Sequence, residues 1–191
     1  MAEDGVERWS PLLAGLYSLI ARDPKSNRVL VEIASVDEGD VFLDIGCGPG
    51  AALERTAATG ARVAGVDPSP SMVKRAARRV PEAEVKVGSA EDLPFTDDSF
   101  TVVASISSFH HWADRQAGLS EALRVLRPGG RLHIMEGRVK GRHGHGLTES
   151  EAASLAAKLE ELGYQNTGVE EIPVGRWRTY YVVSGTVPDK V

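Results

Sequence analysis

The chain has 191 residues, of which 42% are hydrophobic and 26% are charged, and its formal net charge is −5. This composition is that of one globular domain, so a mainly disordered chain is excluded, and the acidic balance argues against non-specific nucleic-acid binding. No apolar run reaches the ~20 residues that a membrane-spanning helix needs. The single cysteine, Cys47, excludes an intramolecular disulfide and a cysteine-based structural zinc site.

The first 36 residues are expected to form a helical cover. Asp23-Pro24 is expected to end a first helix, and a second, short helix is expected at about 27–34. The acidic start, Met1–Asp4, lacks the basic-then-apolar layout of a signal peptide, so we expect a cytoplasmic protein. The apolar and aromatic residues that recur at helical spacing in the first helix are Trp9, Leu12, Leu13, Leu16, Tyr17 and Ile20.

From residue 40 onward, short apolar strands alternate with helical patterns. Strands are predicted at residues 41–45, 62–66, 84–87, 100–105 and 131–136. Helices are predicted at 51–59 and 70–79, and another is marked by Leu119 to Leu126 and stops at 128–130. Such alternation predicts right-handed crossovers and a mostly parallel sheet with helices on both faces. In such a sheet, ligands bind at the carboxyl ends of the strands.

The C-terminal part follows a glycine-rich connection. Residues 137–147 contain four glycines and no apolar periodicity, so we interpret them as a mobile loop. A capping box at 148–151 predicts a helix, and 165–171 and 178–185 predict an antiparallel pair of last strands. The expected organisation is a single domain of residues 1–191. Its parts are a cover (1–36), a ligand-binding core (40–136), the loop (137–147) and a C-terminal helix with a strand pair (148–191).

A glycine-rich turn, Asp44-Ile45-Gly46-Cys47-Gly48-Pro49-Gly50, joins the first core strand to its helix. Glycines there let a ligand approach the backbone, and the helix start offers free N–H groups. Asp67 ends the next strand, where an acid can accept both hydroxyls of a ribose. A dinucleotide and an adenosyl amino acid both fit this pattern. Asp44 disfavours the dinucleotide, because its charge faces a pyrophosphate poorly but suits the ammonium group of a methionine-like ligand.

These residues resemble a class I S-adenosylmethionine-dependent methyltransferase, of the small-molecule branch that includes ubiquinone- and menaquinone-biosynthesis enzymes. The stretches 41–50, 63–72, 88–95 and 126–136 match that family in order, and 100–112 matches more loosely. The resemblance implies an α/β, Rossmann-like fold with a mostly parallel seven-stranded sheet, helices on both faces and an antiparallel last strand pair. It also implies S-adenosyl-L-methionine as cofactor and methyl transfer to a small organic molecule.

The resemblance assigns cofactor contacts residue by residue. The matches of Asp44, Gly46 and Gly48 hold the methionine end, the match of Asp67 holds the ribose, and the match of Met72 lies against the adenine. Further contacts are expected after the third strand, where Ser89 replaces the family's usual acid, and the choice among Ser89, the backbone at Ala90 and Glu91 is open. The predicted cofactor-binding residues are Tyr17, Asp44, Gly46, Cys47, Gly48, Asp67, Pro68, Met72, Ser89, Ala90, Glu91 and Ser105.

Two histidine pairs are candidates for chemistry. Methyl transfer is an in-line displacement that requires positioning and exclusion of water, and an oxygen or nitrogen nucleophile also needs a base. His110 and His111 follow the fourth strand and are the predicted catalytic residues, although either could instead cap a turn or pack beside Trp112. His143 and His145 could bind a metal, but no acid or cysteine lies close in the sequence. We therefore expect no metal site, and a substrate lid and a disordered connection without function both stay open.

The sequence leaves open what encloses the substrate and which of several functions the protein has. Substrate must be enclosed by the N-terminal helices and the 137–147 loop or by a second subunit, which leaves a homodimer open. We expect a small-molecule substrate and neither a nucleic-acid partner nor a membrane. One alternative is a non-catalytic cofactor-binding module that acts through a partner, and a nicotinamide-dependent oxidoreductase is disfavoured by Asp44. Core packing is expected for most of the aromatic residues that could line a pocket: Trp9, Tyr17, Trp112, Trp177, Tyr180 and Tyr181.

Overall fold

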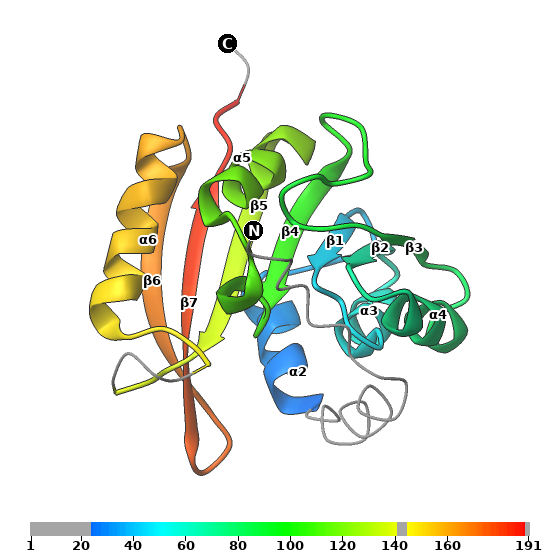
Figure 1. The fold of residues 1–191 in the computed structure, drawn as a ribbon, viewed down its shortest axis with the longest axis horizontal. Helices are drawn as coiled ribbons and strands as arrows, with labels where there is room; N and C mark the ends of the chain where they lie inside the picture. Colours follow the sequence, from blue (N-terminus) through cyan, green and yellow to red (C-terminus); the bar gives the residue numbers. More distant parts are fainter. Residues whose placement is uncertain (1–23, 141–144, 190–191) are drawn as a thin grey trace, which may run out of the picture.

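The computed structural model describes residues 24–140 and 145–189, which form a single seven-stranded sheet with helices around it (Figure 1). The strand order is β3-β2-β1-β4-β5-β7-β6. Neighbours from β3 to β5 are parallel, whereas β7 is antiparallel to both β5 and β6. The strands are β1 (Val41–Ile45), β2 (Arg62–Asp67), β3 (Glu84–Val87), β4 (Phe100–Ile106), β5 (Leu126–Gly137), β6 (Gln165–Val174) and β7 (Arg178–Thr186).

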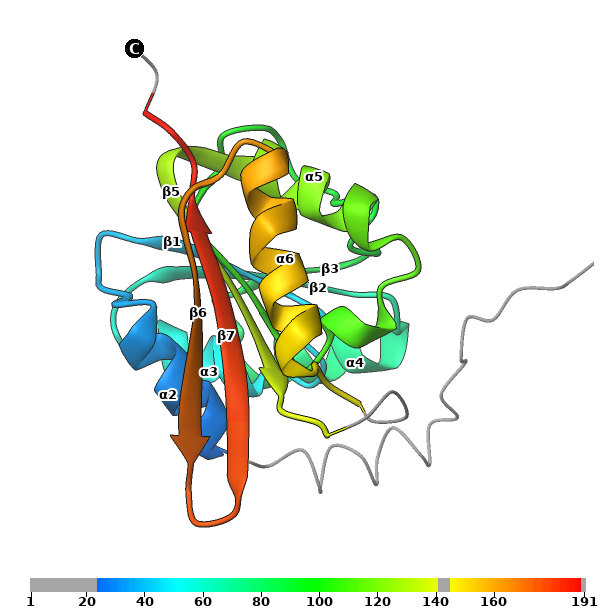
Figure 2. The same cartoon turned by 90° about the vertical axis from the view of Figure 1, so that its left-hand side faces the viewer.

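Helices cover both faces of this sheet (Figure 2). The helices are α2 (Pro24–Ile33), α3 (Ala51–Ala57), α4 (Pro70–Arg79), the short 3₁₀ helix η1 (Phe109–His111), α5 (Arg115–Val125) and α6 (Glu149–Glu161). Figure 2 shows α5 and α6 on one side of the sheet and α2 and α3 on the other. No helix in the described ranges is both long and apolar enough to cross a membrane.

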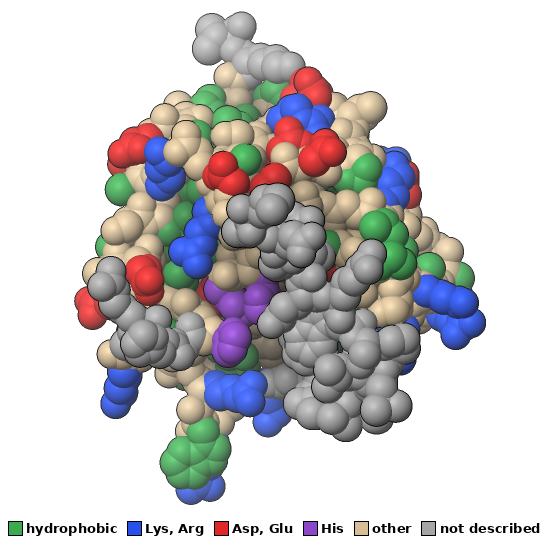
Figure 3. Space-filling model, in the orientation of Figure 1, with side chains coloured by type: hydrophobic (Ala, Val, Ile, Leu, Met, Phe, Trp, Pro, Cys, Tyr) green, Lys and Arg blue, Asp and Glu red, His purple; other side chains and the backbone are tan. Residues whose placement is uncertain are grey.

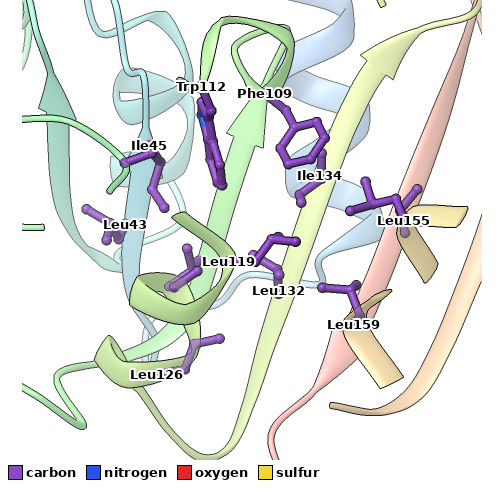
Figure 4. Packing of buried hydrophobic residues seen from close by; sticks show 14 of the residues in the cluster. Leu43, Ile45, Phe109, Trp112, Leu119, Leu126, Leu132, Ile134, Leu155 and Leu159 are labelled. Carbon is purple, nitrogen blue, oxygen red and sulfur yellow. The ribbon is translucent and has the colours of Figure 1, made fainter. Parts of the chain in front are cut away.

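Each helical layer has its own hydrophobic core, because the central strands are apolar on both faces. Leu119 of α5 and Leu155 of α6 pack on one face with Leu43 and Ile45 of β1 (Figure 4). On the opposite face, Leu30, Leu53 and Ala76 of α2, α3 and α4 pack with Phe42, Val102 and Val182. The two layers therefore fix the carboxyl ends of β1 and β4 between them, at the point where the strand order reverses.

The predicted α/β fold with a mostly parallel seven-stranded sheet and an antiparallel last pair is confirmed. The bounds predicted for β1 and β3 agree with those observed, and the capping box of Thr148 and Glu151 forms at the start of α6. Other boundaries were wrong: α2 begins at Pro24, α3 ends at Ala57, and β6 continues to Val174. The largest difference is that α5 ends at Val125 and β5 begins at Leu126, before residues 128–130. Leu126 pairs with Phe100 of β4, and the register then shifts to accommodate the extra residues.

The aromatic residues divide between core and surface. Trp112 is buried and packs against Phe109 with ring centroids 4.9 Å apart, and Tyr180 and Tyr181 are buried, as expected. Trp177, in the hairpin between β6 and β7, is 87% exposed and does not belong to the core. Trp9 and Tyr17, with the predicted first helix, lie outside the described residues.

Candidate active site

The glycine turn lies at the carboxyl end of β1 and leads into α3. Gly46, Gly48 and Gly50 have φ angles of 78°, 51° and 80°, a conformation that residues with a side chain rarely adopt. A Cβ on Gly46 would lie 1.8 Å from Oγ of Ser108, in the segment after β4, whereas a Cβ on Gly48 would meet no atom within 4 Å. Gly46 therefore allows two strand ends to touch, and Gly48 leaves its side of the turn open.

Two buried acids face this turn. Asp67, at the end of β2, accepts hydrogen bonds from the backbone N–H groups of Gly48 and Ser69, each at 2.9 Å. Burial raises the pKa of Asp67, and these two bonds oppose the rise. Each carboxylate oxygen has a further lone pair, so Asp67 can still accept hydroxyl groups of a ligand.

Asp44 is more deeply buried, at 3% exposure, and its Oδ1 has no hydrogen-bond partner among the described residues. Burial, together with the charge of Asp67, raises the pKa of Asp44 to about 7. A buried carboxyl oxygen without a partner is costly in a folded protein. Asp44 and Asp67 together therefore suit a cationic ligand group, which could donate a hydrogen bond to the unpartnered Oδ1 of Asp44.

The other predicted cofactor residues lie in different surroundings. Met72 is buried in the first turn of α4, and Pro68 is exposed before it. Ser105 is fully buried near the end of β4, and its Oγ has no partner among the described residues. Cys47 is buried too, and burial raises the pKa of its thiol, so it is not a ready nucleophile. Tyr17 lies outside the described residues.

The three candidates for the adenine contact also differ. Glu91 accepts hydrogen bonds from the backbone N–H groups of Ala113 and Asp114, at 2.8 and 3.2 Å, so it ties the loop after β3 to the start of α5. Burial opposes ionisation of Glu91, but its hydrogen bonds outweigh this and lower its pKa. Ala90 is buried in the core beneath α5, and Ser89 lies beside it, half-buried.

The predicted base, His110, is held by a buried acid. Its ring Nδ1 lies 2.9 Å from Oε2 of Glu136, and its backbone N–H donates to Oε1 of the same residue at 3.3 Å. Glu136, at the end of β5, is fully buried. Because a carboxylate only accepts, the contact places the proton of His110 on Nδ1 and leaves the lone pair on Nε2.

Histidines from two segments, η1 and the end of the 137–147 loop, meet at this dyad. The rings of His110 and His111 are 4.0 Å apart between centroids, and His145 lies 5.2 Å from the first and 5.9 Å from the second. Figure 3 shows histidine side chains gathered in one patch on this face. His143, the other member of the His-x-His pair, lies outside the described residues. Backbone hydrogen bonds join the two ends of the predicted loop, residues 137–147. The N–H of Leu147 donates to the carbonyl of Gly137 at 3.0 Å, and the carbonyl of Leu147 accepts from the N–H of Val139 at 2.9 Å.

Glu136 was missed by the sequence analysis as a functional candidate. It ends a strand that is otherwise apolar from Leu132 to Met135, apart from His133, and such an acid at a strand's carboxyl end is the signal that could have found it. His133 is buried, and burial with the neighbouring Arg131 lowers its pKa to about 4. It therefore stays neutral inside the sheet and does not belong to the histidine patch.

The strand order, the antiparallel β7 and the glycine turn after β1 define a Rossmann-like fold of the class I methyltransferase type. A methyltransferase of Aquifex aeolicus, described as SAM dependent, has this fold, with a TM-score of 0.75 at 20% identity over 93% of this chain and 98% of that chain. The family model described as "Methyltransferase domain" matches residues 43–134.

Two curated relatives are similar in sequence. Erythromycin 3''-O-methyltransferase of Saccharopolyspora erythraea is 40% identical over 136 residues, which are 66% of this chain and 43% of the relative. Demethylmenaquinone methyltransferase of Tropheryma whipplei is 35% identical over 117 residues, which are 60% of this chain and 49% of the relative. The chain therefore spans less than half of the length of either. Its residues 43–134 match the methyltransferase domain family, and its relatives and its fold are those of methyltransferases, including a SAM-dependent one.

Proposed function

We propose that this protein transfers a methyl group from S-adenosylmethionine to a small organic molecule. The observation that carries the proposal is the orphaned Oδ1 of Asp44, buried beside Asp67 at an open glycine turn. A zwitterionic ligand with an ammonium group fits this place, because the ammonium can donate to the unpartnered oxygen. The alternative of a non-catalytic module is not favoured by relatives that are named methyltransferases.

The chain's own residues hold the cofactor in this proposal. Asp44 accepts from its ammonium group, and Asp67 accepts from its ribose. The backbone N–H groups of Gly46 and Cys47 donate to the carbonyl of Val66, and that of Gly48 donates to Asp67, so they hold the turn in place, and the open side of Gly48 leaves room for the methionine end. Met72 packs against the adenine, with Ser89 or the backbone at Ala90 at the adenine's polar edge. When bound, the cofactor supplies an electrophilic methyl group on a sulfonium.

On the acceptor side, His110 acts as the base. Glu136 fixes its ring orientation and tautomer through the 2.9 Å contact at Nδ1, which leaves Nε2 to take a proton from an oxygen or nitrogen nucleophile. Buried Trp112 and Phe109 fix the backbone of η1, and so the position of His110. Glu136 therefore orients His110 as a base. A carbon acceptor that is already an enolate would not need a base.

We also propose that the acceptor is a free small molecule and not a nucleic acid, which agrees with the net charge of −5. The two relatives, an erythromycin 3''-O-methyltransferase and a demethylmenaquinone methyltransferase, support a small organic acceptor. A cytoplasmic location and a homodimer remain predictions from the sequence. Size-exclusion chromatography with light scattering checks the dimer.

The test uses S-adenosylmethionine that carries a labelled methyl group. Purified protein is incubated with cell extract of the source organism, and label is counted in the organic-soluble, protein and nucleic-acid fractions. Label in the organic fraction supports the proposal and yields the acceptor. His110→Ala then lowers transfer about 10²–10⁴-fold, the usual contribution of a general base. Label only in protein or nucleic acid contradicts the substrate class.

A further inference from the structure

We infer that His110, His111 and His145 form a binding site for a late divalent transition metal of the Zn²⁺ type. One ring nitrogen from each of these residues lies within 4.8 Å of the other two. His111 and His145 are exposed, and His110 is half-buried, so a metal ion can reach all three. The neighbours of His143 and His145 along the chain predicted no metal site, because His110 and His111 are more than 30 residues away in the sequence and meet His145 only in the fold.

The spacing of the three rings suits such an ion. Zinc binds imidazole nitrogen at about 2.0–2.1 Å, so ligand nitrogens of a tetrahedral site lie about 3.3 Å apart. The observed upper limit of 4.8 Å requires the rings to approach by only about 1.5 Å. Exposed side chains change rotamer within nanoseconds, so this closure needs no movement of the backbone. Three protein ligands also leave a fourth position open, as in catalytic zinc sites.

Glu136 supplies a second, independent indication. Ligand histidines commonly donate their other ring N–H to a carboxylate, which fixes the ring and strengthens the metal bond. His110 makes this contact with the fully buried Glu136 at 2.9 Å. The buried acid therefore orients the lone pair of Nε2 outward and brings a negative charge next to the bound cation.

The backbone holds all three histidines at the end of β5. Ser107, just before η1, donates its N–H to the carbonyl of Met135 at 2.8 Å, and His110 donates its backbone N–H to Glu136. His145 lies two residues before Leu147, which is buried and donates to the carbonyl of Gly137. The site is therefore assembled by contacts to one strand, although its members come from distant parts of the sequence.

The metal and the proposed base chemistry exclude each other at His110. A neutral imidazole has one lone pair, and Nε2 uses it either to accept a proton or to bind the metal. Metal binding itself does not depend on the proposed function, whereas its effect on methyl transfer does. Zn²⁺ at the site is therefore expected to inhibit methyl transfer by removing the base.

The binding test uses untagged protein, so that no added histidines contribute. Zn²⁺ is titrated against a chromophoric chelator, and Co²⁺ is added separately as a spectroscopic probe. One equivalent of Zn²⁺ per chain and intense visible absorption of four-coordinate Co²⁺ are expected, with no competition from Mg²⁺, which prefers oxygen ligands. S-adenosylhomocysteine binding is measured on the same samples, so that failure of the metal site and failure of the proposed function are told apart.

Variants assign the ligands. His111→Ala and His145→Ala replace exposed side chains and are expected to abolish the stoichiometric site, whereas Glu136→Gln weakens it about 10–100-fold, as for other carboxylates behind a ligand. Trp177→Ala, which removes an exposed ring from the β6–β7 hairpin, is the matched control and keeps parental affinity. Thermal melting checks that each variant is folded. Absence of Zn²⁺ binding by the parent, or equal binding by the His111→Ala, His145→Ala double variant, would overturn the inference.

Discussion

The two halves of the candidate active site, on either side of the boundary between β1 and β4, are built in different ways. The half at β1 and β2 uses a glycine turn and two acids at the carboxyl ends of these strands, Asp44 within β1 and Asp67 as the last residue of β2. The half at β4 and β5 combines His110 with a buried acid 26 residues away and with His145 from a further segment. In the first half, only Asp67 joins the local turn through strand pairing, whereas every contact of the second half requires the sheet.

The largest expected effect concerns the point where the halves touch. Gly46→Ala adds a Cβ 1.8 Å from Oγ of Ser108 at a positive φ, and it should lower the free energy of unfolding by about 2–5 kcal/mol. Gly48→Ala is the matched control, because its φ is also positive but its Cβ meets nothing within 4 Å, so it should cost only about 1–2 kcal/mol. Urea unfolding measures both. An equal loss of unfolding free energy in the two variants would show that the close contact between Gly46 and Ser108 does not affect stability.

The next effect separates binding from stability in the β1–β2 half. Asp44→Asn removes the charge that meets the ligand's ammonium group, so affinity for S-adenosylhomocysteine should fall by about 2–5 kcal/mol, or at least about 30-fold. The free energy of unfolding at pH 8 should stay equal or rise, because a buried carboxylate beside Asp67 is removed. Calorimetric titration and urea unfolding measure the two quantities. A destabilised variant with unchanged affinity would contradict the assignment of Asp44.

A smaller effect is the pH dependence of the same half. The folded pKa of Asp44, about 7, lies above its unfolded value near 3.9, so the ligand-free protein holds a proton that the unfolded chain has lost between these values. Its contribution to stability therefore decreases as pH rises from about 4 to 7.

Binding has the opposite sign, because the ligand's ammonium group prefers ionised Asp44. Affinity for S-adenosylhomocysteine should increase as pH rises from 6 to 8, and binding at pH 6 should release about one proton. Titrations in buffers of different ionisation enthalpy measure that proton. The Asp44→Asn variant should release none, and a parental level of release from it would assign the proton to another group.

The same contrast explains what the sequence could predict. The bounds of β1 and β3, the turn at Gly46–Gly50 and the capping box at Thr148 depend on neighbours along the chain, and these predictions agree with the structure. The early start of β5 depends on pairing with β4, which local signals at 128–130 do not contain. Glu136 had no visible role in the sequence, because only the parallel register of β4 and β5 brings it to His110.

The most direct test of this division is calorimetric titration of S-adenosylhomocysteine into the parent protein and two variants. Asp67→Ala removes the predicted ribose contact, and His110→Ala removes the predicted base from the other half. We expect that the parent binds, that Asp67→Ala binds much more weakly, and that His110→Ala keeps parental affinity. No binding to the parent, or an equal loss of affinity in both variants, would contradict this expectation.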